Sequence, residues 1–109
     1  MRKGEVWLVD IPARGGHGQF GTRPALLATD VEAGMAVAIP CTSNLAHTKR
    51  FSRTVLIHPT KHNGLSVDSV LLIHHLLSID TRFLLHKIGA LEKSTLDKVS
   101  EEIQAYFRL

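Results

Sequence analysis

The chain has 109 residues, of which 13 are lysine or arginine and 10 are aspartate or glutamate, so its formal net charge is +3. This length predicts a single domain over residues 1–109, and the one cysteine excludes an intrachain disulfide and a cysteine zinc site. No apolar run approaches the ~18 residues of a membrane-spanning helix, which predicts a cytoplasmic protein without a membrane segment. The positive charge permits a polyanionic partner without requiring one.

Short β-rich runs separated by turn residues occupy most of the chain, which is typical of a mainly β protein. We expect strands at residues 5–11, 25–29, 35–40, 54–58, 69–73 and 84–88. The segment 13–23 contains four glycines and is predicted to form a loop rather than a regular element. Asn63-Gly64 is a turn signal, because both residues tolerate a positive φ.

The last segment changes from a strand pattern to a helical one. Its apolar residues recur at spacings of three and four: Leu96, Val99, Ile103 and Phe107. We therefore expect a C-terminal helix that turns these residues toward the core, with Ser94 as its N-cap. Five or six strands and one helix predict a small, strongly bent sheet or partly open barrel that the helix covers.

Arg23 follows the glycine-rich loop and precedes Pro24, so its backbone is expected to be extended at the mouth of a strand. A planar guanidinium that never loses its proton is suited to bidentate contacts with a phosphate group. On spacing alone, however, an ordinary surface arginine at a sheet edge is the favoured interpretation.

Two polar segments follow the third expected strand. Residues 41–44, Cys-Thr-Ser-Asn, stand at its carboxyl end, where hydroxyl groups can donate hydrogen bonds to a phosphoryl oxygen. Ser and Asn also commonly stabilise turns, which is the alternative. Further on, a basic stretch with one aromatic ring is typical of a track for single-stranded RNA, and equally of a solvated loop. The members of this stretch are His47, Lys49, Arg50, Phe51 and Arg53.

Seven histidines raise the question of a metal site, but their spacing argues against one. His74 and His75 are adjacent, and adjacent residues of a strand point to opposite faces. No histidine pair has the i,i+4 spacing with an acid beside it that a helical zinc site requires. We therefore expect no metal site. His17, His74, His75 or His86 could transfer protons near neutral pH, although a lone histidine is more often structural.

Taken together and in order, these motifs resemble the MazF/PemK (Kid-like) family of toxins from toxin–antitoxin systems. The segments that carry the resemblance are residues 3–10, 16–24, 39–43, 64–65, 68–70, 78–80 and 87–91. Each motif alone is weak, but their shared order reverses the interpretation of Arg23 as a surface residue. The resemblance implies a mainly β fold with a C-terminal helix, an SH3-like small barrel of the CcdB/MazF type.

The resemblance also implies an endoribonuclease that needs no metal or cofactor, selects a sequence in single-stranded RNA and leaves a 2′,3′-cyclic phosphate. It implies Arg23 and Thr42 as stabilisers of charge on the phosphoryl oxygens, and His17 as a group that transfers protons. With the basic stretch, the candidate RNA-binding residues are Gln19, Ser43, Lys49, Arg50, Arg53, His74 and His75. The implied protein partners are a cognate antitoxin and a second copy of the chain in a homodimer.

The chain departs from the family pattern at several positions. Gly18 stands where many relatives carry Glu, and Leu77 replaces a common arginine. His74 and His75 stand where relatives usually have an acid and Gln. Two outcomes are open: an active enzyme with an altered base preference, or a weakened or silent one. Survival of the Arg–Thr pair favours activity, since a histidine can do acid–base work.

The alternative is a toxin-fold protein that acts by binding and cleaves nothing. CcdB-like toxins inhibit DNA gyrase with a similar barrel and depend on a C-terminal Trp-Gly-Ile tail, whereas residues 106–109 here are Tyr-Phe-Arg-Leu. The glycine-rich loop that ends in Arg23-Pro24 also favours the nuclease. A silent module that binds only its antitoxin is a third interpretation.

Overall fold

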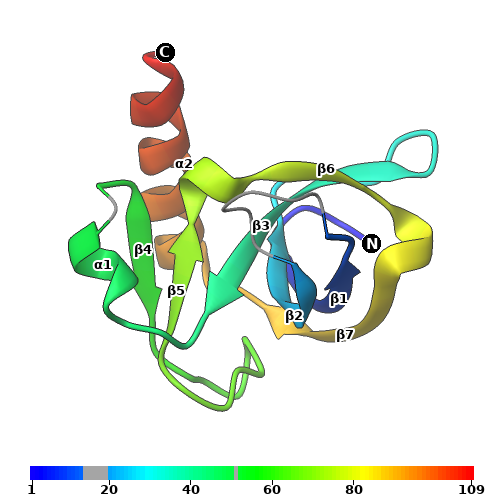
Figure 1. Ribbon diagram of the computed structural model, residues 1–109, viewed down its shortest axis with the longest axis horizontal. Coiled ribbons are helices and arrows are strands. Elements are labelled where there is room, and N and C mark those ends of the chain that lie inside the picture. The colour runs from blue at the N-terminus through cyan, green and yellow to red at the C-terminus, as the bar shows by residue number, and fades with distance from the viewer. Residues whose placement is uncertain (14–19, 51) are drawn as a thin grey trace.

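In the computed structural model, which describes residues 1–13, 20–50 and 52–109, most of the chain forms antiparallel strands (Figure 1). The strands are β1 (Glu5–Ile11), β2 (Gly21–Leu27), β3 (Met35–Thr42), β4 (Thr54–Ile57), β5 (Ser69–Leu72), β6 (Leu77–Asp80) and β7 (Leu84–Ala90). The helices are α1 (His47–Arg50) and α2 (Lys93–Phe107), with two short 3-10 helices, η1 (Ile73–His75) and η2 (Thr81–Phe83). None of the described helices is long and apolar enough to cross a membrane.

The strands lie in the order β4-β5-β3-β2-β1-β7, and β6 also pairs with β3. Every pair is antiparallel. Within the described residues, β4 and β7 end the sheet without pairing to each other, so the sheet stays open where a barrel would close. The prediction of a mainly β fold with a C-terminal helix is confirmed, and Figure 1 shows α2 beside β4.

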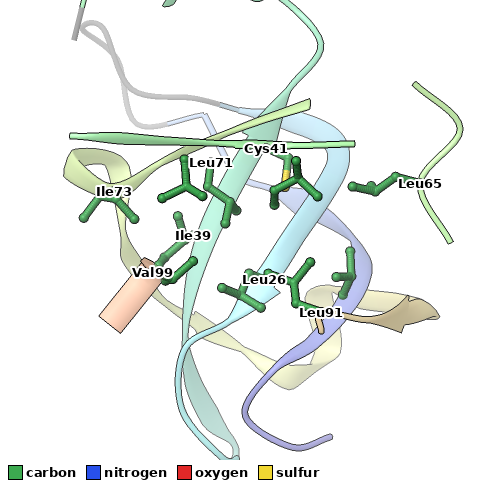
Figure 2. Close-up of a cluster of buried hydrophobic side chains, with 11 residues drawn as sticks. Leu26, Ile39, Cys41, Leu65, Leu71, Ile73, Leu91 and Val99 are labelled. Atoms are coloured by element: carbon green, nitrogen blue, oxygen red, sulfur yellow. The ribbon is translucent and has the colours of Figure 1, made fainter. Parts of the chain in front are cut away.

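Both faces of the central strands are buried, which explains their continuous apolar runs. In β2, Leu26 points into one core cluster, whereas its neighbours Ala25 and Leu27 belong to a second. Figure 2 shows the first cluster, which α2 joins through Val99. The second cluster contains residues of β6 and β7. The sheet is therefore held from both sides.

β3 belongs to two parts of the sheet in turn. Its first residues pair with β6 and its middle residues with β2, whereas Cys41 and Thr42 pair with β5. The ladder between β2 and β3 ends at the pair Ala25↔Pro40. The Ala28 amide donates to the Val37 carbonyl, so every second residue from there bonds across the two strands, and the next rung would place Pro24 opposite Cys41. Because Pro24 has no amide hydrogen, it cannot donate to that rung, and the two strands separate there.

The structure differs from the sequence prediction in segments close to this separation. β2 begins at Gly21, so Arg23 and Pro24 lie inside the strand and not before it. At Pro24 the strand pairs with β1 alone, and this position tolerates a missing amide hydrogen. The sequence predicts neither β6 nor α1.

α2 confirms the predicted C-terminal helix, but both of its ends differ from the prediction. The helix begins at Lys93, with Glu92 and not Ser94 at the N-cap position. Val99 faces the core as predicted. Phe107 is 52% exposed, because the last turn of the helix reaches past the sheet (Figure 1).

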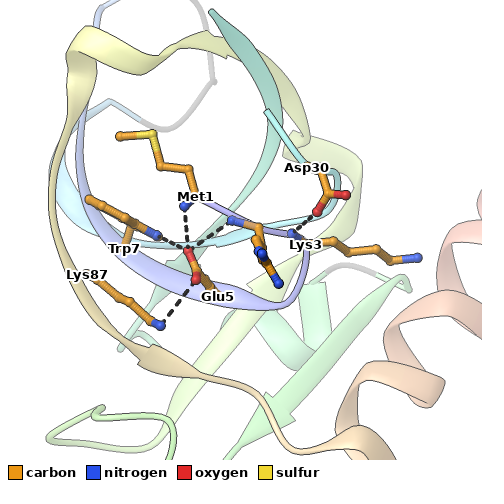
Figure 3. Close-up of polar contacts among 7 residues, drawn as sticks. Met1, Lys3, Glu5, Trp7, Asp30 and Lys87 are labelled. Atoms are coloured by element: carbon orange, nitrogen blue, oxygen red, sulfur yellow. Dashed lines mark hydrogen bonds and ion pairs between the residues drawn. The ribbon is translucent and has the colours of Figure 1, made fainter. Parts of the chain in front are cut away.

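Glu5 ties the start of β1 to its neighbours through one half-buried carboxylate (Figure 3). Its Oε1 atom accepts hydrogen bonds from the Trp7 indole at 2.9 Å and from the Arg2 amide at 3.0 Å. Its Oε2 atom lies 3.1 Å from the Lys87 ammonium of β7. Burial opposes ionisation, but these donors outweigh it and hold the pKa of Glu5 at about 2.

Replacing Glu5 with glutamine should lower the free energy of unfolding at pH 7, because the variant loses the negative charge that the surrounding donors stabilise. The expected loss is only about 1–2 kcal/mol, because solvent screens the interaction with the exposed Lys87. Folding lowers the pKa of this carboxyl, so its contribution is complete above the unfolded value near 4.5 and disappears as the pH falls toward 2. Urea unfolding across this range measures the effect. The control Glu101→Gln, on the exposed face of α2, should change stability by less than about 0.5 kcal/mol. A loss that is independent of pH would contradict the assignment.

Candidate active site

A pocket of about 540 Å³ opens where β2 and β3 separate. It is lined by Leu8, Thr22, Arg23, Pro24, Cys41, Thr42, Ser43, Gly64, Leu65, Ser66, Val67, Ser69 and Ile88. None of these lining residues is a carboxylate or a histidine; the polar ones supply hydroxyl groups, a thiol and one guanidinium. The volume falls within the about 300–1,000 Å³ that is usual for small-ligand sites.

Arg23, the third residue of β2, presents a half-buried side chain to the pocket. Its Nε and Nη2 atoms donate to the Phe20 carbonyl at 3.2 and 2.7 Å, which fixes the plane of the guanidinium. Burial raises the pKa of the Cys41 thiol to about 12, against the opposing effect of the Arg23 charge. The thiol is therefore protonated at neutral pH and cannot act as a nucleophile.

Thr42 and Ser43 place two hydroxyl groups at the end of β3. By the register of the β2–β3 ladder, Arg23 and Thr42 stand two residues beyond the last pair, one on each strand. The Thr42 Oγ1 atom accepts the Asn44 amide at 3.1 Å, so its own hydrogen points elsewhere and can be donated. Thr42 can therefore stabilise the turn and still donate its own hydrogen to a ligand, two roles that the sequence leaves as alternatives.

Residues 64–67 form a third side of the pocket, which the sequence analysis does not predict. They follow Asn63, whose side chain is fully buried. The Asn63 Oδ1 atom accepts hydrogen bonds from the Thr60 and Leu65 amides, both at 3.0 Å. Its Nδ2 atom donates to the His58 carbonyl at 2.9 Å. One side chain therefore fixes the backbone between β4 and the pocket.

Two glycines bring the same segment against β7. Gly64 has a φ of +70°, and a side chain there would collide with the Ile88 carbonyl. A side chain at Gly89 would likewise collide with the backbone of Asn63. The Asn-Gly pair is the one available sequence signal for this packing, and it predicts only a turn.

Several predicted RNA-binding residues are not brought to the pocket. Lys49 is exposed on α1. Arg53 forms an ion pair with Glu102 of α2, with its Nη1 atom 3.2 Å from the carboxylate Oε2 atom. Neither basic residue lines the pocket. Outside the described part of the chain lie His17, Gln19, Phe51 and the side chain of Arg50.

His74 and His75 occupy η1 and not a strand, so the prediction that they point to opposite faces is wrong. Their rings meet edge to face, with centroids 4.2 Å apart. Burial and repulsion from His47 lower the pKa of His74. Burial, the two neighbouring histidines and the charge of Arg23 lower the pKa of His75. Both imidazoles are therefore neutral at pH 7. Among the side chains that the structure describes, no group of three or more His, Cys, Asp or Glu could hold a metal ion.

Comparison with known proteins decides the family. The family of PemK-like, MazF-like toxins of type II toxin–antitoxin systems matches residues 2–107. The chain belongs to this family. It is also 34% identical to Endoribonuclease MazF9 of Mycobacterium tuberculosis, over 100% of this chain and 98% of that relative.

Solved structures of MazF toxins share the fold. MazF from Deinococcus radiodurans superposes with a TM-score of 0.82 at 24% identity, over 100% of this chain and 97% of that one. An endoribonuclease in complex with its cognate antitoxin, from mycobacterial species, gives 0.74 at 15% identity, over 100% and 94%. The MazF-type fold, the toxin family and its endoribonuclease class, all predicted from the sequence, are confirmed.

Replacing Asn63 with alanine should lower the free energy of unfolding by about 3 kcal/mol, because the buried Leu65 amide and the His58 carbonyl lose their partner. The matched control is Asn44→Ala, which removes one exposed hydrogen bond to the Ala46 amide and should cost less than about 1 kcal/mol. Urea unfolding of both variants checks the difference. Similar losses for the two would show that Asn63 does not hold the segment.

Replacing His75 with glutamine should flatten the dependence of the melting temperature on pH below neutrality. Folding lowers the pKa of His75, so the unfolded chain binds more protons and stability falls as the pH drops through about 6.5. Melting curves should therefore decline more steeply for the unsubstituted protein than for the variant between pH 7 and pH 5.5. Above pH 7.5 the two should run parallel. Parallel curves over the whole range would refute this prediction.

Proposed function

We propose that this toxin cleaves single-stranded RNA in the pocket between β2, the end of β3 and residues 64–67. The observation that carries the proposal is the convergence of Arg23 and Thr42 on one pocket of nucleotide size, from strands that separate at Pro40. A fixed cation and hydroxyl donors around one opening are suited to binding a phosphate and stabilising the charge of its transition state.

The proposed reaction begins when a 2′-hydroxyl of the RNA attacks the adjacent phosphorus. The bond from phosphorus to the 5′-oxygen breaks, the 2′-proton passes to a base, and another proton reaches the departing 5′-oxygen. The products are a 2′,3′-cyclic phosphate and a 5′-hydroxyl. Arg23 stabilises the non-bridging oxygens, with Thr42 and Ser43 as further donors, and His17 is our candidate for proton transfer.

The chemistry of the pocket favours catalysis without a metal ion or cofactor. The lining residues that the structure describes supply hydroxyls and a guanidinium, whereas Mg²⁺ and Zn²⁺ are bound by carboxylate oxygens, imidazoles or thiolates. Stabilisation of the phosphoryl charge therefore falls to Arg23, which stays ionised at every working pH.

We assign the path of the RNA beyond the pocket to the remaining candidates. These are Gln19, Lys49, Arg50, Arg53, His74 and His75. The exposed ammonium of Lys49 can bind a phosphate without breaking any described contact. Arg53 must first give up its ion pair with Glu102. The positive charge of Arg23 helps to lower the pKa of His75, which is neutral at pH 7. When the negative charge of RNA offsets that of Arg23, His75 can accept a proton.

Two protein partners follow from the family. We infer a cognate antitoxin as one partner, which the solved complex of a similarly folded endoribonuclease with its antitoxin supports. We propose that this antitoxin lies over the pocket and blocks RNA. We also infer a homodimer, because a chain of 109 residues buries a smaller share of its surface on its own than a larger protein does. The protein acts in the cytoplasm as one toxin domain over residues 1–109.

Replacing Arg23 with alanine should lower the rate of RNA cleavage by about 10²–10³, the usual effect of removing one donor to a charged transition state. The control Arg82→Ala makes the same change in net charge at an exposed residue of η2 and should leave the rate unchanged. Cleavage of a mixed RNA pool is followed in EDTA, and the new ends are tested for 2′,3′-cyclic phosphate.

Three outcomes of this experiment would contradict parts of the proposal. An intact RNA pool with the unsubstituted protein would refute nuclease activity and favour action by binding alone. Cleavage that requires a divalent metal would refute the mechanism and retain the enzyme class. Equal cleavage by the Arg23→Ala and Arg82→Ala variants would move the active site away from the pocket.

A further inference from the structure

The pocket has two chemically different sides. Arg23, Thr42 and Ser43 gather charge and hydroxyl groups on the strands β2 and β3. Leu65 and Val67 bring apolar side chains from the opposite segment, between β4 and β5. A nucleotide has the same division, because its phosphate needs cations and donors and its base offers flat faces to apolar groups. A nucleotide with its phosphate at Arg23 would therefore direct its base toward Leu65 and Val67.

Val67 is the exposed apolar residue of this second side. Its side chain is 53% exposed, whereas Leu65 beside it is buried in the core. A single exposed apolar residue is ordinary on a protein surface. Val67 differs because it stands on the wall of a pocket, next to the exposed hydroxyl of Ser66. An apolar surface and a hydrogen-bonding group side by side are what recognition of a base requires.

The backbone that carries Val67 is fixed from several directions. The Ser69 hydroxyl donates to the Val67 carbonyl at 3.0 Å. The His58 Nδ1 atom lies 2.9 Å from the Asp68 carboxylate, a contact that joins the two ends of the connection between β4 and β5. Asn63 holds the first half of the same connection from within. A wall that is held in place can discriminate between bases by shape, because it does not move to accommodate each of them.

We propose that Val67 is a specificity-determining residue whose side chain contacts a nucleobase of the bound RNA. The inference rests on the proposed function in taking RNA as the occupant of the pocket. With the phosphate held by Arg23 and Thr42, the adjacent base lies against Val67, and the Ser66 hydroxyl reaches its edge. Val67 takes no part in the bond-breaking step, so its replacement changes which RNA is preferred and not whether RNA is cleaved.

The experiment compares the unsubstituted protein with Val67→Thr, which keeps the β-branched shape and exchanges a methyl group for a hydroxyl. The matched control is Leu85→Thr, at a residue of β7 that is 51% exposed and does not line the pocket. Binding is measured by fluorescence anisotropy with four homo-oligonucleotides of 2′-O-methyl RNA, which lack the attacking hydroxyl and cannot be cleaved. Cleavage sites in a random RNA pool are sequenced in parallel, and thermal melting verifies that each variant is folded.

We expect Val67→Thr to change the ratio of dissociation constants between the preferred and the least preferred base by about fourfold or more, the contribution of one buried methyl group. Cleavage sites should show an altered base frequency at one position, and Leu85→Thr should alter neither. Unchanged ratios with Val67→Thr would overturn the inference, as would an equal change with Leu85→Thr. If Val67→Thr does not fold, Val67→Ala takes its place with the same expected outcome. Base-dependent binding that Val67 controls, found without any cleavage, would support this inference while refuting the proposed nuclease.

Discussion

The end of the ladder between β2 and β3 is the constraint on which the site depends. Paired strands lie about 4.8 Å apart and leave no room for a ligand between them. Beyond the pair Ala25↔Pro40 the ladder stops, because the next rung would need an amide hydrogen from Pro24, and β3 continues by pairing with β5. The space between the separated strands becomes the pocket, with Arg23 on β2 and Thr42 on β3. Backbone chemistry at one residue thus makes room for the side chains that meet RNA in the proposed reaction.

An opening in a sheet keeps its shape only if the surrounding strands are held. Here the central strands have core on both faces, and α2 closes one of the two clusters through Val99. The third side of the pocket is held differently, by the buried amide of Asn63 and by the close approach of Gly64 to β7. Apolar packing therefore positions the side proposed to bind the phosphate, whereas hydrogen bonds position the side proposed to contact the base. This division lets one side vary without disturbing the other.

The sequence predicts the parts of this molecule whose signals are local. β1 has the predicted bounds, and Val99 is buried as the helical period requires, because each pattern is complete within a few residues. β2 is predicted to start too late, because Pro24 is tolerated in a strand only where β3 has turned away, which no local pattern reveals. Asn63 predicts a turn and nothing more, because its partners become evident only once the connection is folded. Arg23 is identified as a candidate site residue by the order of the family motifs along the chain, and not by its spacing from other residues.

The protonation state of the histidine pair likewise cannot be predicted from the local sequence. A strand would have separated His74 and His75, but η1 brings their rings into contact, and each is held neutral by burial and by neighbouring positive groups. Neither histidine lines the pocket, so in the proposed reaction the pair acts on the RNA beyond the cleaved phosphate, where a neutral imidazole has an advantage over a carboxylate. It adds no negative charge before the reaction, and it becomes positive when it accepts a proton. That new charge would attract the RNA backbone and contribute to binding rather than to the bond-breaking step, because neither ring lines the pocket that contains Arg23 and Thr42.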